Sequence, residues 1–107
     1  MGLIDITPFV ASAVTTAHVI ALEGRSKGMI VAPAALNAAD ITFQVSARQD
    51  TNFRDAYKSD GSTVIKITGA AAGRAYTFPA ELFGAAYVKM VLSVGQAAAR
   101  EFIVTVE

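Results

Sequence analysis

Hydrophobic and polar side chains alternate with a period of two through much of the second half of the chain. In the two clearest runs, 41–47 and 87–94, apolar residues occupy every second position. This alternation is typical of strands that have one buried side and one solvent-facing side. We therefore expect Phe43 and Leu92, which lie in the middle of these runs, to be core residues. The full set of positions expected to face inward is Ile41, Phe43, Val45, Ala47, Val88, Met90, Leu92 and Val94.

Shorter runs occupy the rest of the chain and are separated by Gly, Pro, Asn and Asp, the residues that favour turns. Pro79 predicts a helical turn over 79–83, because proline is well suited to a first helical position. The sequence contains no helical pattern longer than this single turn. The chain is therefore expected to be all-β, an antiparallel β-sandwich or jelly roll of about eight strands. The expected strands are 13–22, 29–32, 40–47, 53–58, 63–68, 74–78, 87–94 and 100–106.

The first twelve residues are expected to form an extended N-terminal arm, 1–12, ahead of a single domain at 13–107. Pro8 lacks a backbone donor and disfavours a central strand position. The arm is nevertheless too apolar for a free tail, so we expect it to contact a partner and expect the domain to fold without it. Its apolar residues are Leu3, Ile4, Ile6 and Phe9.

Composition indicates a protein that packs against other molecules. Of 107 residues, 53% are hydrophobic and only 17% are charged, with nine basic and nine acidic residues. A surface with few charges and no net charge gives little electrostatic repulsion between protein molecules. This favours a homo-oligomer or a larger assembly. Nucleic acid is not an expected partner, because its phosphates require clustered Lys and Arg. Neither is a membrane, because no apolar run reaches about 18 residues and 1–14 lacks the basic start of a secretory signal.

Few residues could carry catalysis or hold a metal, and we expect no enzyme, cofactor or metal site. The chain has no cysteine, and its single histidine, His18, has no neighbours in sequence that would complete a zinc site or orient a general base. Asp50, Asn52 and Asp55 could form a calcium turn, although turn capping is the simpler interpretation. Asp55 and Glu81 could act on a glycoside only if they faced each other across a cleft.

Aromatic residues and one glycine-rich segment offer two further possibilities. Tyr57, Tyr76 and Tyr87 could stack on sugar rings if they were exposed, whereas an aromatic pair such as Tyr76 and Phe78 is usually part of the core and rim of a sandwich. The segment 69–73 lacks the Lys-Ser/Thr of a phosphate-binding loop and precedes a strand, so it is expected to be a spacer loop.

Two segments resemble a known class of domain. The run Ile41-Thr42-Phe43-Gln44-Val45-Ser46, followed by Phe53, Tyr57 and Ser59-Asp60-Gly61, resembles the strand–turn–strand of discoidin-like, galactose-binding-type jelly rolls. The run Ala86-Tyr87-Val88-Lys89-Met90-Val91 is similar to the penultimate strand of those domains. The chain departs from the pattern at Phe53, where the family has Trp, and it is shorter than the usual domain of that family.

Together with the segment Arg74-Ala75-Tyr76-Thr77-Phe78-Pro79-Ala80-Glu81-Leu82-Phe83, these runs resemble small virion proteins of tailed bacteriophages, which include capsid decoration and cement proteins. The resemblance implies a non-enzymatic structural protein of the virion, assembled in the bacterial cytoplasm. Its implied partners are the major capsid protein and copies of itself. The alternative function is a carbohydrate-binding module of a head or tail fibre that uses Tyr57, Tyr76 or Tyr87.

Overall fold

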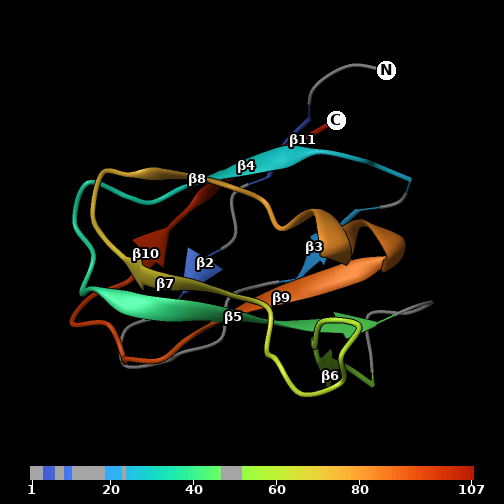
Figure 1. The fold of residues 1–107 in the computed structure, drawn as a ribbon. Helices are drawn as coiled ribbons and strands as arrows, with labels where there is room; N and C mark the ends of the chain where they lie inside the picture. The colour runs from blue at the N-terminus through green and yellow to red at the C-terminus, as the bar shows by residue number, and fades with distance from the viewer. Residues whose placement is uncertain (1–3, 7–8, 11–18, 23, 47–51) are drawn as a thin grey trace.

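The chain forms an all-β sandwich of antiparallel strands, as the alternating pattern predicts (Figure 1). The computed structural model describes residues 4–6, 9–10, 19–22, 24–46 and 52–107. Within these residues there are more strands than the eight expected, because several are only two or three residues long. The elements are β1 (Ile4–Ile6), β2 (Phe9–Val10), β3 (Ile20–Ala21), β4 (Gly28–Val31), β5 (Ala39–Ser46), β6 (Arg54–Asp55), β7 (Lys66–Ala70), β8 (Ala75–Thr77), a 3₁₀ helix (Ala80–Gly84), β9 (Tyr87–Leu92), β10 (Arg100–Glu101) and β11 (Ile103–Val106).

The larger sheet is centred on β5 and β9, the two strands with the clearest alternation. They pair in antiparallel register from Ile41 opposite Leu92 to Ser46 opposite Tyr87. Strand β3 extends the sheet beyond β9, and the other edge of β5 pairs with β7 along its first half and with β6 near its end. The predicted inward face is confirmed at Phe43 and Leu92, which are 1% and 2% exposed. It is wrong at Val94, which is 46% exposed because the strand ends at Leu92.

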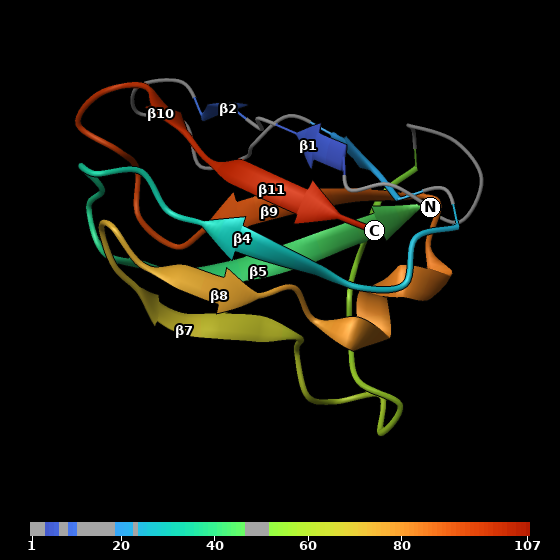
Figure 2. The same cartoon turned by 90° about the horizontal axis from the view of Figure 1, so that it is seen from above.

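The second layer is a four-stranded sheet in the order β1-β11-β4-β8 (Figures 1 and 2). Strand β1 pairs antiparallel with β11, with Ile4 opposite Val106 and Ile6 opposite Val104. Residues 4–6 of the expected N-terminal arm therefore form an edge strand of this sheet. Residue Phe9 also belongs to a strand, since β2 pairs with β10. Leu3 lies outside the described residues.

The strand predicted at 100–106 is divided into two strands that serve different sheets. Arg100 and Glu101 pair with β2, whereas Ile103 to Val106 lie between β1 and β4. Phe102 separates the two strands and is fully buried. A buried aromatic residue at the break fixes the chain to the core while its backbone passes from one ladder to the other.

The core lies between the two main sheets and is built from aliphatic and phenylalanine side chains. The ring of Phe43 in β5 lies 5.9 Å, centroid to centroid, from that of Phe78, which follows β8. Phe78 in turn lies 5.1 Å from Phe83 in the 3₁₀ helix. These tilted aromatic contacts join the two layers and the helix. Burial of this apolar surface supplies the main stabilisation of the fold.

A polar network closes the end of the sandwich near β10. Gln96 is buried, and its Oε1 accepts hydrogen bonds from the Asn37 backbone N–H at 2.8 Å and from Arg100 Nε at 3.3 Å. Its Nε2 donates to the carbonyl oxygens of Asn37 and Val94 at 3.0 and 3.2 Å. Both ends of the buried amide are thus satisfied, which avoids the cost of an unpaired polar group. The network ties the loop after β4 to the loop after β9.

Candidate functional site

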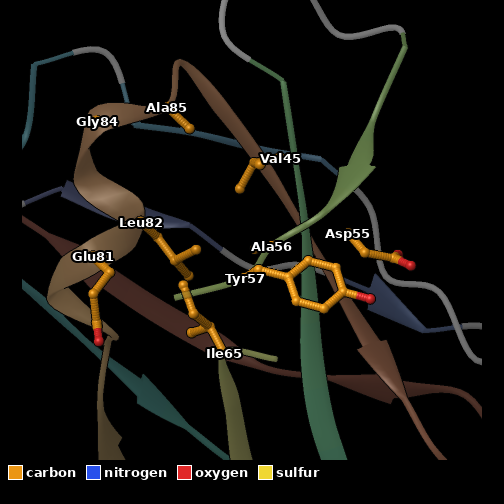
Figure 3. Close-up of a pocket in the computed structure, with 9 residues that line it drawn as sticks. All are labelled: Val45, Asp55, Ala56, Tyr57, Ile65, Glu81, Leu82, Gly84 and Ala85. Atoms are coloured by element: carbon orange, nitrogen blue, oxygen red, sulfur yellow. The ribbon is translucent and has the colours of Figure 1, made fainter. Parts of the chain in front are cut away.

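An open pocket of about 300 Å³ lies beside β6 and the 3₁₀ helix (Figure 3). Its polar side chains are Asp55, at the end of β6, Tyr57, two residues further on, and Glu81 in the first turn of the helix. In Figure 3 the carboxylate of Asp55 and the hydroxyl of Tyr57 point to the side away from the helix, and the carboxylate of Glu81 points away from both. Residues of β6 and of the helix thus border one pocket although they are far apart in the sequence, but their carboxylates do not face each other.

The rest of the lining is mostly aliphatic. Val45 comes from β5, Ala56 and Ile65 lie on the two arms of the 57–64 loop, and Leu82 and Ala85 come from the helix and its end. Ala56, Ile65 and Leu82 are buried. The pocket thus combines an apolar floor with a few polar groups at its sides, the usual composition of a ligand site.

Backbone hydrogen bonds attach the Tyr57 side of the pocket to the larger sheet. The Ala56 N–H donates to the carbonyl of Phe43 at 2.9 Å, and the Ile65 N–H donates to the carbonyl of Ala56 at 3.1 Å. Tyr57 forms an isolated antiparallel bridge with Val64. Its side chain is 48% exposed. The ring is consequently accessible to a ligand while its backbone is held by the sheet.

The turn beyond Tyr57 is organised by Asp60. Its Oδ1 accepts hydrogen bonds from the backbone N–H groups of Ser62 and Thr63, each at 2.9 Å, and its Oδ2 accepts one from Thr63 Oγ1 at 2.6 Å. These bonds favour the ionised carboxylate, first through the Thr63 hydroxyl, and lower the pKa of Asp60 to about 2. The predicted turn at Ser59-Asp60-Gly61 therefore owes its shape to this side chain, and Gly61 adopts a positive φ of 75°.

The opposite side of the pocket is the single helical turn predicted from Pro79. The carbonyl of Pro79 accepts a hydrogen bond from Leu82 N–H at 3.1 Å, and the carbonyl of Leu82 accepts one from Ala85 N–H at 3.0 Å. Leu82 is buried, whereas Glu81 is exposed. Because Leu82 anchors the turn in the core, the neighbouring Glu81 is directed to the surface at the pocket.

The pocket lining carries two carboxylates and no Lys or Arg. Asp55 Oδ1 accepts a hydrogen bond from Gln44 Nε2 at 3.2 Å, and this bond leaves its second carboxylate oxygen for another donor. No hydrogen bond or ion pair joins Glu81 to another side chain among the residues that the structure describes. Gln44 and Val45 are neighbours in β5 and point to opposite faces of the sheet. The hydrogen bond to Gln44 therefore holds the Asp55 carboxylate on the face opposite to Val45, away from the pocket floor.

The three tyrosines proposed for sugar stacking are not brought together here. Only Tyr57 lines the pocket. Tyr76 lies in β8 opposite Ile30, packs against the core and accepts a hydrogen bond at its hydroxyl oxygen from the Ala71 N–H at 2.9 Å. Tyr87 begins β9 opposite Ser46 and is half-buried. A shared sugar platform made of all three rings is not present.

The candidate metal ligands either lie outside the described residues or do not form a common site. His18 and Asp50 lie outside the described residues, Asn52 is an exposed residue with a φ of 58°, and Asp55 belongs to the pocket. Within the described ranges, no group of three or more His, Cys, Asp or Glu side chains could hold a metal ion. No helix in the same ranges has the length and hydropathy needed to cross a membrane.

A second candidate site is the side of the four-stranded sheet that faces away from the core, which we call the outer face. Alternate residues of β11, β4 and β8 form two rows across it. These six residues are uncharged, and in β1 the row through Thr105 continues to Asp5. Met29 and Ile103 are the large apolar residues exposed on this face, at 39% and 45%. The rows are Ile103, Val31 and Ala75, and Thr105, Met29 and Thr77.

One end of the outer face is bounded by an ion pair between Lys27 Nζ and Glu107 Oε1 at 3.0 Å. An open hollow of about 360 Å³ lies beside this pair and is also lined by Met29, Thr77 and Thr105. Surface ion pairs of this kind contribute little to stability, but a charged border around an uncharged patch is the usual arrangement of a protein interface.

Comparison with known proteins shows the fold of the chain. No protein-family model matches the sequence, and neither does any curated protein. Among solved structures, the crystal structure of the SPBc2 prophage-derived protein YomS is similar, with a TM-score of 0.58 and 8% sequence identity. The match covers 99% of this chain and 95% of that one. The two proteins therefore share a fold over almost their whole lengths, and a relationship to discoidin-like domains stays a prediction.

Proposed function

We propose that the chain is a non-enzymatic structural protein of a tailed-phage virion, of the capsid decoration or cement type. The part of the outer face over β11, β4 and β8 carries this proposal, because its uncharged rows of apolar and Thr side chains form a surface suited to burial against protein. The shared fold with a prophage-derived protein supports a phage origin. The partners are the major capsid protein and copies of the chain itself.

Decoration would stabilise the shell through binding alone. A protein that binds assembled capsid and not the free capsid subunit shifts the assembly equilibrium toward the shell. The outer face would cover a joint between capsid subunits, with Met29 and Ile103 as its main apolar contacts. Ile4 and Ile6 would contribute to this surface only indirectly, because they lie in β1, which pairs with β11 at the edge of the sheet.

The test measures binding to capsids of the encoding phage that were assembled without this protein. Met29→Lys and Ile103→Lys each place a charge in the outer face at an exposed site, so both variants should fold and should bind capsids at least about tenfold more weakly, because a buried unpaired charge is costly. Val94→Lys is the matched control, since Val94 is equally exposed on another surface. Co-sedimentation in which all three variants bind like wild type would contradict the proposal.

Self-association needs a separate measurement. Sedimentation of the isolated protein should show a concentration-dependent oligomer if copies also pair through this face, and Met29→Lys should then shift it toward the monomer. A monomer at all concentrations would confine the interaction to the capsid.

A further inference from the structure

We infer that the free edge of β6 binds an extended segment of a protein partner, which adds a strand to the larger sheet and places one aliphatic side chain in the adjoining pocket. This site is separate from the outer face, because β6 belongs to the other sheet and none of the six residues that define the outer face lines the pocket. Its occupation can therefore be measured independently of capsid binding.

One edge of β6 has no neighbouring strand among the described residues. β6 ends the strand order β3-β9-β5-β6, and the N–H of Ala56, the residue after it, donates to the carbonyl of Phe43 in β5 at 2.9 Å. In an antiparallel ladder, residues that bond to the neighbouring strand alternate with residues that do not. The N–H and carbonyl of Asp55 therefore point to the free edge.

Tyr57 presents its backbone at the same edge. Backbone hydrogen bonds of the two residues that flank it, Ala56 and Lys58, enclose its bridge with Val64. In such a bridge the N–H and carbonyl of the central residue point away from the partner. Two N–H donors and two carbonyl acceptors, from Asp55 and Tyr57, thus form a row with which an extended chain can pair.

The pocket lies on the inward side of this row. Ala56, between the two edge residues, is buried and lines the pocket together with Val45 and Leu82. Residues directly opposite each other on neighbouring strands have Cβ atoms about 5 Å apart on the same face of the sheet. The partner residue opposite Ala56 would therefore direct its side chain into the pocket. At about 300 Å³ and with an aliphatic floor, the pocket suits a residue such as leucine.

The other face of the added strand meets the carboxylate of Asp55, which points away from the helix (Figure 3). Gln44 Nε2 donates to its Oδ1 at 3.2 Å and leaves Oδ2 for another donor. The partner residue opposite Asp55 would lie on this face, where opposite charges on neighbouring strands attract. A lysine or arginine is therefore expected next to the aliphatic residue. Proline is excluded at the positions that donate to the edge, because it has no N–H.

The direct test is an NMR titration of ¹⁵N-labelled protein with the peptide acetyl-Thr-Val-Leu-Lys-Thr-amide. In antiparallel pairing, the direction of the described ladders, its valine, leucine and lysine lie opposite Tyr57, Ala56 and Asp55. The amides of Asp55 and Tyr57 should shift most. Amides of β8, the edge strand of the other sheet, should shift little, because its residues do not line this pocket.

Methylation of the peptide backbone distinguishes strand pairing from general contact. An N-methyl group on the valine or the lysine removes a donor aimed at the edge and should weaken binding about five- to tenfold. The matched control is an N-methyl group on the leucine, whose nitrogen faces away from the edge, and it should change affinity by less than about twofold. Replacement of the leucine by alanine should weaken binding about tenfold, because less apolar surface is buried.

Charge reversal tests the register. Asp55→Lys should weaken binding of the lysine peptide about three- to tenfold, and a peptide with glutamate in place of lysine should recover most of the loss. Glu101→Lys reverses the same charge on exposed β10 and should leave binding unchanged. Met29→Lys, in the outer face, should also bind the peptide like wild type, whatever its affinity for capsids.

Three results would overturn the inference. The first is an absence of shifts at Asp55 and Tyr57 with about 10 mM peptide, a concentration that saturates most of a millimolar complex. The second is equal affinity of the three N-methylated peptides, which would show that the backbone is not paired. The third is equal shifts at the edges of β6 and β8, which would show that the pocket does not select the site.

Discussion

The hydroxyl of Thr63 donates a 2.6 Å hydrogen bond to the carboxylate of Asp60, and the Thr63 backbone N–H donates a second to the same side chain at 2.9 Å. These two bonds, with one from Ser62, shape the turn that supports the Tyr57 side of the pocket. Because all three bonds are stronger to the ionised carboxylate than to the neutral acid, the stability of this turn depends on pH.

We predict that Asp60 titrates near pH 2, below its usual value of 3.8. A carboxyl with a lower pKa in the folded than in the unfolded state stabilises the fold above the unfolded value, and that contribution is lost as the pH falls through the folded value. The turn should thus lose its stabilisation between about pH 4 and pH 2. Carbon-13 NMR of the side-chain carboxyl measures the midpoint. Thr63→Val should raise it toward the usual value, and an unchanged midpoint in that variant would contradict the role given to the hydroxyl.

We predict that Phe43→Ala lowers the free energy of unfolding by about 3 to 5 kcal/mol and Leu92→Ala by about 2 to 5 kcal/mol. Both side chains are nearly inaccessible to solvent, and Phe43 also contacts Phe78, so truncation leaves a cavity between the layers. Urea denaturation measures the change. Val94→Ala, at an exposed position, should alter the unfolding free energy by less than about 0.5 kcal/mol. Equal effects at the three positions would contradict the assigned core.

We predict that Gly28→Ala destabilises the protein by about 1 to 3 kcal/mol, the usual cost of overpacking. A Cβ at this position would overlap the carbonyl oxygen of Thr105 in β11, with Val106 Cγ1 also in close contact. The two strands would have to move apart. Gly84→Ala is the control, because nothing lies within 4 Å of a Cβ at Gly84 and its φ is not positive. Thermal unfolding should separate the two variants clearly, and equal midpoints would show that the β4–β11 spacing can adjust.

We predict that deletion of residues 1–9 destabilises the fold, contrary to the expectation of a dispensable arm. It removes β1 and half of β2, and leaves one edge of β11 without a partner. Lys27 and Glu107 exchange both backbone hydrogen bonds, so by the alternation of an antiparallel ladder the N–H groups of Val104 and Val106 are directed toward β1. Hydrogen exchange at these two amides should accelerate most. Full protection there after the deletion would argue against the β1 pairing.

The alternation of apolar and polar residues predicts the long strands of this protein but not the short ones. The runs around Phe43 and Leu92 predict strands well, because one buried face imposes a period of two over many residues. Strand β1 is too short for such a period, and its partner comes from the other end of the chain. The error at Val94 has a simpler cause, since apolar alternation continued past the last paired residue, Leu92.

The candidate pocket could be predicted only in part. Pro79 predicted the helical turn and Asp60 the turn beyond Tyr57, and both are present. The two turns lie near each other because β5 positions the segment after β6 and because buried Leu82 holds the helical turn against the core. Asp55 and Glu81 are far apart in the chain, and no period or motif in one sequence indicates that they share a pocket.

The position of β11 in the sheet also determines when the outer face can form during synthesis of the chain. β11 lies between β1 and β4 and is the last strand of the chain, so contacts of this sheet join segments that are far apart in sequence. Such contacts carry a high loop-closure cost and tend to form late in folding. During synthesis, β1, β4 and β8 leave the ribosome before their central partner is available. The surface proposed to bind capsids is therefore absent until β11 has been synthesised, so a nascent chain cannot attach to a shell through this face before that point.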